Sequence, residues 1–382
     1  MIYLDHAAAT PMSPTALGAY VKAAEEYFAN TSSLHEQGEK SKQLLEKCRA
    51  ETAQIIQASP NEIFFTSGGT ESNILALEAI FSANGQADSH VITSAAEHPS
   101  VQTFFKKLES KGIEVSYLGV DSSGQISVEE LKQTIKRNTV LASIQHVNSE
   151  TGTIQPLHEI GTVLRESGVI FHSDCVQSFT KLPIQVDKLP ADALSFSGHK
   201  IYGPKGTGAV YLSSRIKWDS VNPLTTHESG FRPGTINLPG IASFTAAAIE
   251  SVENQTSGLK YIRGLRELFF EELKPFTQKF LVEGSSDEAQ LPHIIGMGIE
   301  GYEGQYILLT LDRYGICIST GSACQSGKQD TSVMMQALNR TPQEARRFFR
   351  ISLGVNNTKE EIIRTAEVIK ECIYEREGNA YG

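Results

Sequence analysis

Residues 195–208 read SFSGHKIYGPKGTG, so a short apolar run ends in Ser-Gly-His-Lys and places Lys200 at the end of a predicted strand. Most lysines are solvated at the surface, and that is the ordinary explanation for a single one. A lysine that is partly buried near other cations instead loses its proton and can form a Schiff base with an aldehyde. Lys205, which is followed by Gly-Thr-Gly, is expected in a turn. The other strand ends decide which explanation holds for Lys200.

Polar residues of the types found in active sites also follow the other predicted strands. They are Gly68-Gly69-Thr70 after EIFFTS, Glu97-His98-Pro99 after VITSA, Asn148 after LASIQHV, Asp174 after VIFHS with Gln177 one turn on, and Ser197 and His199 after LSF. Each of these alone is explained by a turn, a helix cap or a core histidine. In an open parallel sheet, however, ligands bind at the carboxyl ends of the strands. The sequence therefore predicts that these groups converge on a small-molecule site.

The chemistry of these groups suits pyridoxal 5′-phosphate. Gly68 and Gly69 let the backbone approach an anion, and a helix that begins there offers unpaired N–H groups to a phosphate. The turn lacks the GKS or GKT of the phosphate-binding loop in nucleotide hydrolases. The imidazole of His98 offers a face for stacking. Asp174 would keep the pyridine nitrogen protonated, so that the ring acts as an electron sink, and Lys200 would form the Schiff base.

A second group of candidate residues lies in ISTGSACQSGKQD, residues 318–330. Cys324 is in a polar stretch rich in Gly and Ser after a predicted strand, and a thiol in an exposed loop is a candidate nucleophile. Cys317 and Cys372 have apolar neighbours, which is typical of buried structural thiols. Arg350 in FFRISLG places a guanidinium in an apolar strand, where it forms either an ion pair or a bidentate clamp on a substrate carboxylate.

The elements that hold these residues alternate between strand and helix from about residue 60 to 215. Apolar strands in this arrangement predict an α/β domain with a mainly parallel sheet covered on both faces, and GTGAVYLS is expected as an antiparallel edge strand. After a helical stretch at 240–273, the strands and helices indicate a smaller α+β unit. We expect residues 14–257 to form a large cofactor-binding domain, and 1–13 with 258–382 to form a small domain that carries the reactive cysteine.

The net charge, the apolar runs and the cysteines of the chain argue against several classes of protein. The 382 residues carry a formal net charge of −10, which argues against a nucleic-acid surface as the main activity. No apolar run approaches the length of a membrane span, and the amino terminus does not resemble a secretory signal. Five cysteines without a CxxC pair fit reduced thiols in the cytoplasm, and they predict neither a disulfide framework nor a metal site.

The motifs together resemble the cysteine desulfurases, which belong to the class V aminotransferase group of pyridoxal-phosphate enzymes and have fold type I. The matching stretches run nearly the whole length of the chain. They are YLDHAAATP, NTSSLH, FTSGGTESN, EHPSV, HVNSETGTIQP, SDCVQS, SFSGHKIYGPKGTG, RPGT, STGSAC and RISLG. The resemblance implies a sheet of seven strands, a homodimer, and conversion of L-cysteine to L-alanine with the sulfur held on Cys324 as a persulfide.

The resemblance also implies a role for each matching residue. Lys200 would hold the cofactor, with His98 stacked on its ring, Asp174 paired with its nitrogen and Gln177 at its phenolic oxygen. The phosphate would be bound by the turn at Gly69, by Thr70, Ser197 and His199, and by Thr235 of the neighbouring subunit. Asn148 and Arg350 would hold the substrate carboxylate, and Cys324 would attack the substrate sulfur.

Some stretches depart from the family pattern. Thr-Thr-His-Glu-Ser replaces a Gly-Gly-x-Gln/His-Glu stretch before RPGT, Pro233 replaces the usual Ser, and Ser178-Phe179-Thr180-Lys181 departs from a run of small residues. These differences suggest a specialised paralogue. Its sulfur acceptor would be an iron–sulfur scaffold or a tRNA-thiolation enzyme.

Two alternatives stay open at this point. A selenocysteine lyase or another β-elimination enzyme of the same fold would keep its turnover without Cys324. A non-catalytic partner that uses the fold only for binding would be expected to lack the lysine or the cysteine. Because Lys200, Asp174, His98 and Cys324 are all present, the sequence favours an enzyme.

Overall fold

The computed structural model describes residues 1–220, 223–285, 288–321 and 332–379, with side chains as far as residue 374. Its larger sheet has seven strands in the order β2-β8-β7-β6-β5-β3-β4. The strands are β2 (Ile63–Thr66), β3 (His90–Ser94), β4 (Glu114–Leu118), β5 (Thr139–Ser143), β6 (Ile170–Asp174), β7 (Ala193–Ser197) and β8 (Gly208–Leu212). This confirms the predicted α/β fold with a mainly parallel sheet.

The position of β8 differs from the prediction. It is antiparallel to both of its neighbours, β2 and β7, as expected for GTGAVYLS. It is not an edge strand, however, because β2 lies outside it and forms that edge of the sheet. All five residues of β8 are buried, so its apolar side chains require cover on both faces. The length of an apolar run gives its burial but does not say which strand pairs with it.

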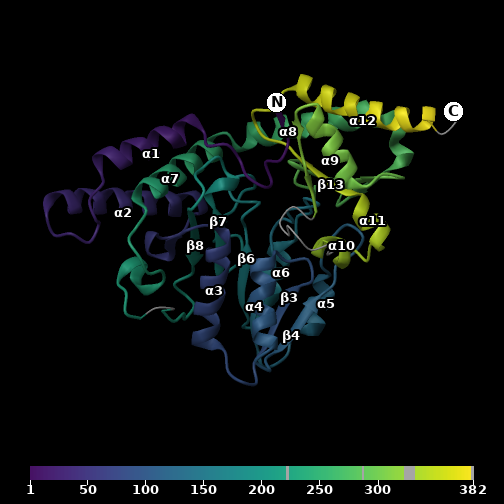
Figure 1. Ribbon diagram of the computed structural model, residues 1–382. Coiled ribbons are helices and arrows are strands. Elements are labelled where there is room, and N and C mark those ends of the chain that lie inside the picture. The colour runs from purple at the N-terminus through teal and green to yellow at the C-terminus, as the bar shows by residue number, and fades with distance from the viewer. Residues whose placement is uncertain (221–222, 286–287, 322–331, 380–382) are drawn as a thin grey trace.

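Helices cover both faces of this sheet (Figure 1). They are α1 (Pro14–Glu26), α2 (Glu36–Ile56), α3 (Gly69–Asn84), α4 (Pro99–Glu109), α5 (Val128–Thr134), α6 (Leu157–Glu166) and α7 (Leu238–Glu253). Alternate strand residues belong to different core clusters: Phe65 packs in a cluster with residues of α2, α6 and α7, and Phe64 packs in another with residues of α3 and α4. The period of two along each strand therefore builds two hydrophobic cores.

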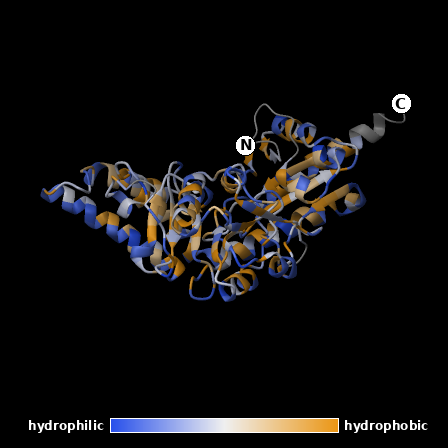
Figure 2. Ribbon diagram, turned by 90° about the horizontal axis from the view of Figure 1, so that it is seen from below, coloured by the Kyte–Doolittle hydropathy of each residue, from blue (hydrophilic) through white to orange (hydrophobic). Residues whose placement is uncertain are grey.

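A smaller antiparallel sheet has the order β12-β13-β10-β9. Its strands are β9 (Phe280–Glu283), β10 (Ile294–Ile299), β12 (Ser319–Thr320) and β13 (Phe348–Ser352). The helices around it are α8 (Gln255–Leu273), α9 (Gly304–Arg313), α10 (Val333–Ala337), α11 (Pro342–Arg347) and α12 (Lys359–Asn379). In Figure 2 the hydrophobic colour is concentrated inside both parts of the molecule, and the outer helices carry many hydrophilic residues.

The amino terminus joins the two parts of the chain. Strand β1 (Ile2–Tyr3) pairs in parallel with β11 (Ile316–Cys317), and Leu4 lies in the core of the smaller part. Thr10 N then donates to His199 O over 2.8 Å, next to Lys200. Residues 2–5 thus pack against the smaller unit, whereas Thr10 bonds to the larger part, and the predicted packing of the whole first dozen residues stays a prediction. The domain limits at residues 14 and 257 stay a prediction.

Within the described residues, no helix has the length and the apolar character that crossing a membrane requires.

Candidate active site

The predicted site residues lie where strands of the larger sheet end. Asp174 is the last residue of β6 and Ser197 the last residue of β7. Glycine Gly68, with φ +144°, turns the chain from β2 into α3, and His98 is the N-cap of α4. The carboxyl ends of the parallel strands share one edge of the sheet, which brings these residues from distant parts of the sequence together.

Asp174 has a donor on each carboxylate oxygen. Asn73 Nδ2 donates to Oδ2 over 2.7 Å, and Val176 N donates to Oδ1 over 2.9 Å. The carboxylate is 8% exposed, and Asn73 also donates to Ser100 Oγ over 3.0 Å. These bonds hold the carboxylate in one orientation. Asn73 was not among the predicted site residues, although it lies one helical turn after Gly-Gly-Thr in the motif FTSGGTESN.

The start of α3 lies beside Ser197 and has backbone donors that are unpaired within the helix. The first helical hydrogen bond runs from Ser72 N to Gly68 O, so the N–H groups of the preceding residues, among them Thr70, have no partner within the helix. A Cβ on Gly69 would lie 2.6 Å from Val176 Cγ2, which explains why a glycine is required here. Ser197 Oγ is 3.0 Å from His199 Nδ1. Hydroxyl, imidazole and backbone N–H groups therefore gather here, and they are suited to a phosphate.

Lys200 is anchored by the amino-terminal segment. Its Nζ donates to Ala7 O over 2.6 Å and to Ala8 O over 2.7 Å. Ala7 O also accepts from Gln177 Nε2 over 3.0 Å, so Lys200 and Gln177 meet at one carbonyl oxygen. The sequence analysis gave this segment no role in the site, because its contacts with Lys200 span more than 190 residues of the chain.

His98 is placed by its own helix. Its Nδ1 accepts from Ser100 N over 3.2 Å and lies 2.8 Å from Ser100 Oγ. Desolvation lowers the pKa of the His98 imidazole; the Asp174 carboxylate opposes this shift, and the charge of Lys200 adds to it. A neutral ring close to both Asp174 and Lys200 is suited to stacking on a flat aromatic cofactor. The preceding Glu97 is 1% exposed, and burial raises the pKa of its carboxyl.

Arg350 and Asn148 lie together at the junction of the two parts. Arg350 Nη2 donates to Asp5 Oδ1 over 2.8 Å, and Nη1 donates to Ser149 O over 2.9 Å. Asn148 Oδ1 accepts from Glu150 N and Thr151 N, which fixes the amide group. Arg350 Nε is buried and has no hydrogen-bond partner in the described part of the chain. The guanidinium is thus oriented and still has a donor to offer.

Cys324 lies outside the described residues, but its C-terminal flank is described. Ser332 Oγ donates to Glu150 Oε2, so this end of the segment 322–331 is attached close to Asn148. Burial raises the pKa of Cys48 to about 11 and that of Cys175 to about 12, so neither thiol is a candidate nucleophile at neutral pH. Cys324 stays the predicted nucleophile.

Thr235 is not part of this cluster. It is exposed in the loop between the 3-10 helix His227–Gly230 and α7, three residues after Arg232, whose Nε donates to Glu71 Oε2 in the first turn of α3 over 2.9 Å. An exposed position agrees with the expected contact to another subunit, which stays a prediction.

The residues present fit pyridoxal 5′-phosphate. The start of α3 with Ser197 and His199 provides donors for a phosphate, Asp174 provides an oriented carboxyl group for a protonated ring nitrogen, and Lys200 provides the amine. The side-chain oxygen of Asn73 is buried without a partner in the described residues, as expected for a site that awaits a ligand. The fold and the site together define a pyridoxal-phosphate enzyme of fold type I.

Comparison with known proteins gives the family. The family model for aminotransferase class-V matches residues 2–364. The chain is 44% identical over 363 residues to the NifS protein of Bacillus subtilis (strain 168), across 95% of this chain and 92% of that protein. It is 36% identical over 375 residues to the cysteine desulfurase IscS of Dictyoglomus turgidum, across 97% and 94%.

Solved structures agree. A NifS-like protein superposes with a TM-score of 0.91 at 30% identity, covering 98% of this chain and 99% of that one. SspA in complex with cysteine superposes with a TM-score of 0.78 at 33% identity, covering 94% and 100%. The chain therefore belongs to the aminotransferase class-V family and, within it, to the cysteine desulfurases, and its cofactor is pyridoxal 5′-phosphate.

Proposed function

We propose that this enzyme converts L-cysteine to L-alanine, takes the sulfur on Cys324 as a persulfide and delivers it to an acceptor protein. The observation that carries this proposal is the convergence of Lys200, Asp174 and His98 at the strand ends. The names of the relatives and the resemblance of the motif GSAC support the choice of substrate and nucleophile.

Substrate binding is assigned to Arg350 and Asn148. Arg350 is already oriented by Asp5 and by Ser149 O, so it loses little further side-chain entropy when it binds a carboxylate. The amide of Asn148 is fixed by its own turn and places a second polar group beside it. Together they would hold the amino acid with its Cα toward Lys200.

Proton transfer is assigned to Lys200. The bound cofactor supplies an electron sink for the charge that develops when the substrate Cα loses its proton. Asp174 holds the proton on the ring nitrogen, which strengthens that sink. Lys200 Nζ takes up the Cα proton, and the carbonyl oxygens of Ala7 and Ala8 stabilise the ammonium group that results.

Sulfur transfer is assigned to Cys324. Its thiolate Sγ forms an S–S bond with the substrate sulfur while the substrate C–S bond breaks. The electron pair of that bond stays with the substrate Cβ, which takes up a proton and becomes the methyl group of alanine. The terminal sulfur of the persulfide then passes to an acceptor thiol.

The acceptor is an iron–sulfur scaffold or a tRNA-thiolation enzyme, and the enzyme works as a homodimer in which Thr235 of one chain completes the phosphate site of the other. Transfer of labelled sulfur from the persulfide to each acceptor class distinguishes the two.

A pair of lysine variants tests the assignment of the site. Lys200→Ala is expected to abolish alanine formation from L-cysteine and to remove the absorbance of the covalently held cofactor. Lys205→Ala is the matched control, because Lys205 is exposed in the same loop. Unchanged absorbance and alanine formation in Lys200→Ala would disprove the proposal.

A further inference from the structure

A cavity of about 470 Å³ is lined by Lys200, by Gln177 and by residues of the amino-terminal segment such as Ala7 and Thr10. His6, Lys181, His293 and Lys200 contribute basic groups to its lining. His98, Asp174 and Arg350, which we assign to cofactor and substrate, do not line it. The cavity therefore adjoins the active site and shares Lys200 and Gln177 with it, but it also extends to residues that we assign to neither the cofactor nor the substrate.

Lys181 has no carboxylate partner within the described residues. Its Nζ donates to Gln177 Oε1 over 3.4 Å, which is a long hydrogen bond to a neutral group. Burial, together with the charges of Lys200 and Arg350, lowers the pKa of Lys181 to about 7. A partly buried ammonium group without a counter-charge is costly in a protein interior.

His6 and His293 also have side-chain polar atoms without partners in the described residues. Their side chains are 6% and 8% exposed, and the Nδ1 atom of each is buried without a hydrogen-bond partner in the described part of the chain. Burial lowers the pKa of His6 to about 4 and that of His293 to about 3, with Lys181 adding to both shifts. Both histidines line the cavity, and a buried polar atom in a native protein nearly always has a partner, so the two rings carry unsatisfied hydrogen-bonding atoms beside it.

The backbone holds Lys181 in place at some cost. The preceding Thr180 has φ +62°, a left-handed conformation that is unfavourable for a β-branched residue. Gln255 Nε2 donates to Thr180 O over 2.9 Å and fixes this conformation. Strain of this kind is concentrated at functional sites, and here it precedes the residue whose charge lacks a partner.

The acidic group of the cavity does not neutralise these cations. Glu250 lines the cavity, but its two oxygens accept from Ser13 Oγ over 2.5 Å and from Thr15 Oγ1 over 2.8 Å. Its hydrogen-bonding capacity is thus used by the start of α1. No ion pair joins it to Lys181 in the described residues.

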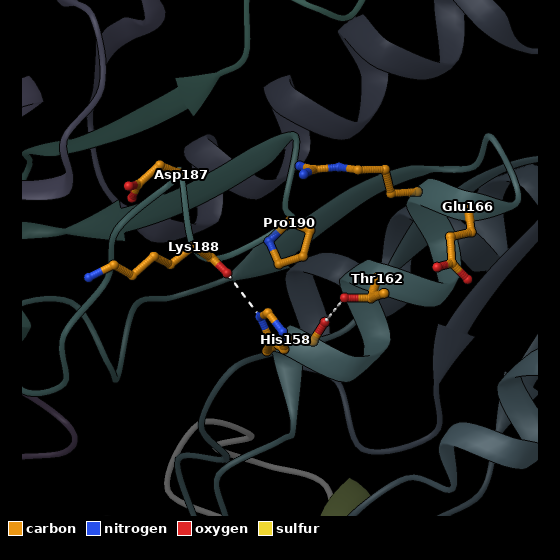
Figure 3. Close-up of a pocket in the computed structure, with 7 residues that line it drawn as sticks. His158, Thr162, Glu166, Asp187, Lys188 and Pro190 are labelled. Carbon is orange, nitrogen blue, oxygen red and sulfur yellow. Dashed lines mark hydrogen bonds between the residues drawn. The ribbon is translucent and has the colours of Figure 1, made fainter.

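A second hollow, on the surface of α6, has no excess of basic over acidic side chains in its lining (Figure 3). Arg165 and Lys188 line it together with Glu166 and Asp187, so its charges balance. His158 Nδ1 is bonded to Lys188 O over 3.0 Å, and the histidine is exposed. This hollow therefore does not share the charge imbalance of the cavity beside Lys200.

We propose that this cavity binds a small anion through Lys181, His6 and His293. The ligand carries phosphate or carboxylate oxygens, which accept from an ammonium group and from imidazole N–H groups. A bound anion would neutralise Lys181 and provide acceptors for the histidines. Two sources share this chemistry, namely inorganic phosphate and a small carboxylic acid.

Thermal unfolding of the holoenzyme tests the proposal, with the cofactor already occupying the phosphate site at α3. Sodium phosphate and sodium acetate are titrated separately at an ionic strength held constant with sodium chloride. We expect a saturable rise of the melting temperature with at least one of them. Lys181→Met should weaken the binding of this anion by about tenfold or more, since a hydrogen bond to a charged group is lost. The matched control Lys188→Met should not weaken its binding.

The anion-dependent increment is the quantity compared, because removing a buried charge alters the melting temperature by itself. A full increment in Lys181→Met would overturn the proposal, since the anion would then be bound elsewhere, for example at Arg350. If Lys181→Met fails to fold, calorimetric titration of the native holoenzyme with each anion tests whether the anion binds. The absence of saturable heat with phosphate and with acetate would overturn the proposal equally.

Discussion

Asp174 illustrates how single residues set the chemistry of the site. Its two oxygens each accept one hydrogen bond, from Asn73 and from Val176 N, and it is almost fully buried. A carboxylate held in this way keeps one position relative to the start of α3. The geometry thus supports its assignment to the ring nitrogen of the cofactor.

Asp174→Asn should lower alanine formation by about 10- to 100-fold, because a charge-assisted hydrogen bond of about 1.5–3 kcal/mol is lost. Cofactor content, measured by absorbance, should be retained. Asp219→Asn is a control, since Asp219 is exposed and bonded to Ser82. Activity of Asp174→Asn within about twofold of the native enzyme would contradict the assignment.

Much of the site could be predicted from residue types at strand ends. Asp174, Ser197 and Lys200 follow apolar runs, and topology alone brings such positions together. The partners Asn73 and Ala7 could not be predicted in the same way. Asn73 is one of many polar residues in a helix, and Ala7 acts through its backbone carbonyl, which leaves no mark on the residue type.

Among the elements, β2 is fixed by a buried ion pair that connects it to the loop before α7. Arg49 on α2 forms two hydrogen bonds of 2.8 Å with Glu228, and Glu228 Oε2 accepts from Phe65 N over 2.7 Å. Arg49 also donates to Ile63 O over 2.7 Å. Because β2 leads into the turn at Gly68, this pair also supports the predicted phosphate site.

Glu228→Gln should destabilise the protein by about 3–5 kcal/mol, because it leaves the buried Arg49 without its counter-charge. Glu46→Gln removes the other, 52% exposed partner of Arg49 and should cost less than about 1 kcal/mol. Urea unfolding of both variants measures the difference. Equal small losses in the two variants would show that the pair contributes little to stability.

His172 on β6 predicts a pH dependence of stability. Its ring lies 2.8 Å from Ser143 Oγ on β5 and 3.0 Å from Ser195 Oγ on β7, and burial lowers its pKa from 6.5 to about 3. Below pH 6.5 the unfolded chain takes up a proton that the folded chain does not. Stability should therefore fall with decreasing pH, by about 1.4 kcal/mol per pH unit for this group.

His172→Gln should make the decline in stability between pH 6.5 and pH 4 less steep by that amount, as measured by urea unfolding at each pH. His158→Gln, which changes an exposed histidine on α6, should leave the slope unchanged. The same slope in all three proteins would mean that His172 does not contribute.

The sequence predicted which strands and helices form better than it predicted which elements pack beside one another. Apolar runs identified the strands of the larger sheet, because a buried parallel strand has few polar residues. The position of β8 inside the sheet and the break between α7 and α8 at Asn254 were not predicted. Both depend on packing against elements far away in the chain.

For the whole molecule, the proposed dimer has a consequence that mixed subunits can reveal. Thr235 is exposed in its own chain and is proposed to contact the phosphate bound by the other. Thr235→Asp should therefore inactivate the enzyme, because a carboxylate would repel that phosphate. Lys200→Ala inactivates the site of its own chain.

Hybrid dimers of these two variants should contain one site with both changes and one intact site. Random mixing makes about half of the dimers hybrids, so the unfolded and refolded mixture should regain about a quarter of the native activity. No recovery, with hybrids confirmed by mass spectrometry, would show that Thr235 does not act across the dimer.

The central claim is that sulfur leaves cysteine through Cys324. The most direct measurement is alanine release from L-cysteine in the presence of a thiol reductant, comparing the native chain with Cys324→Ser. We predict that release is lost in the variant while the cofactor absorbance is unchanged. Equal release from both proteins would contradict the role of Cys324 and favour direct elimination at the cofactor.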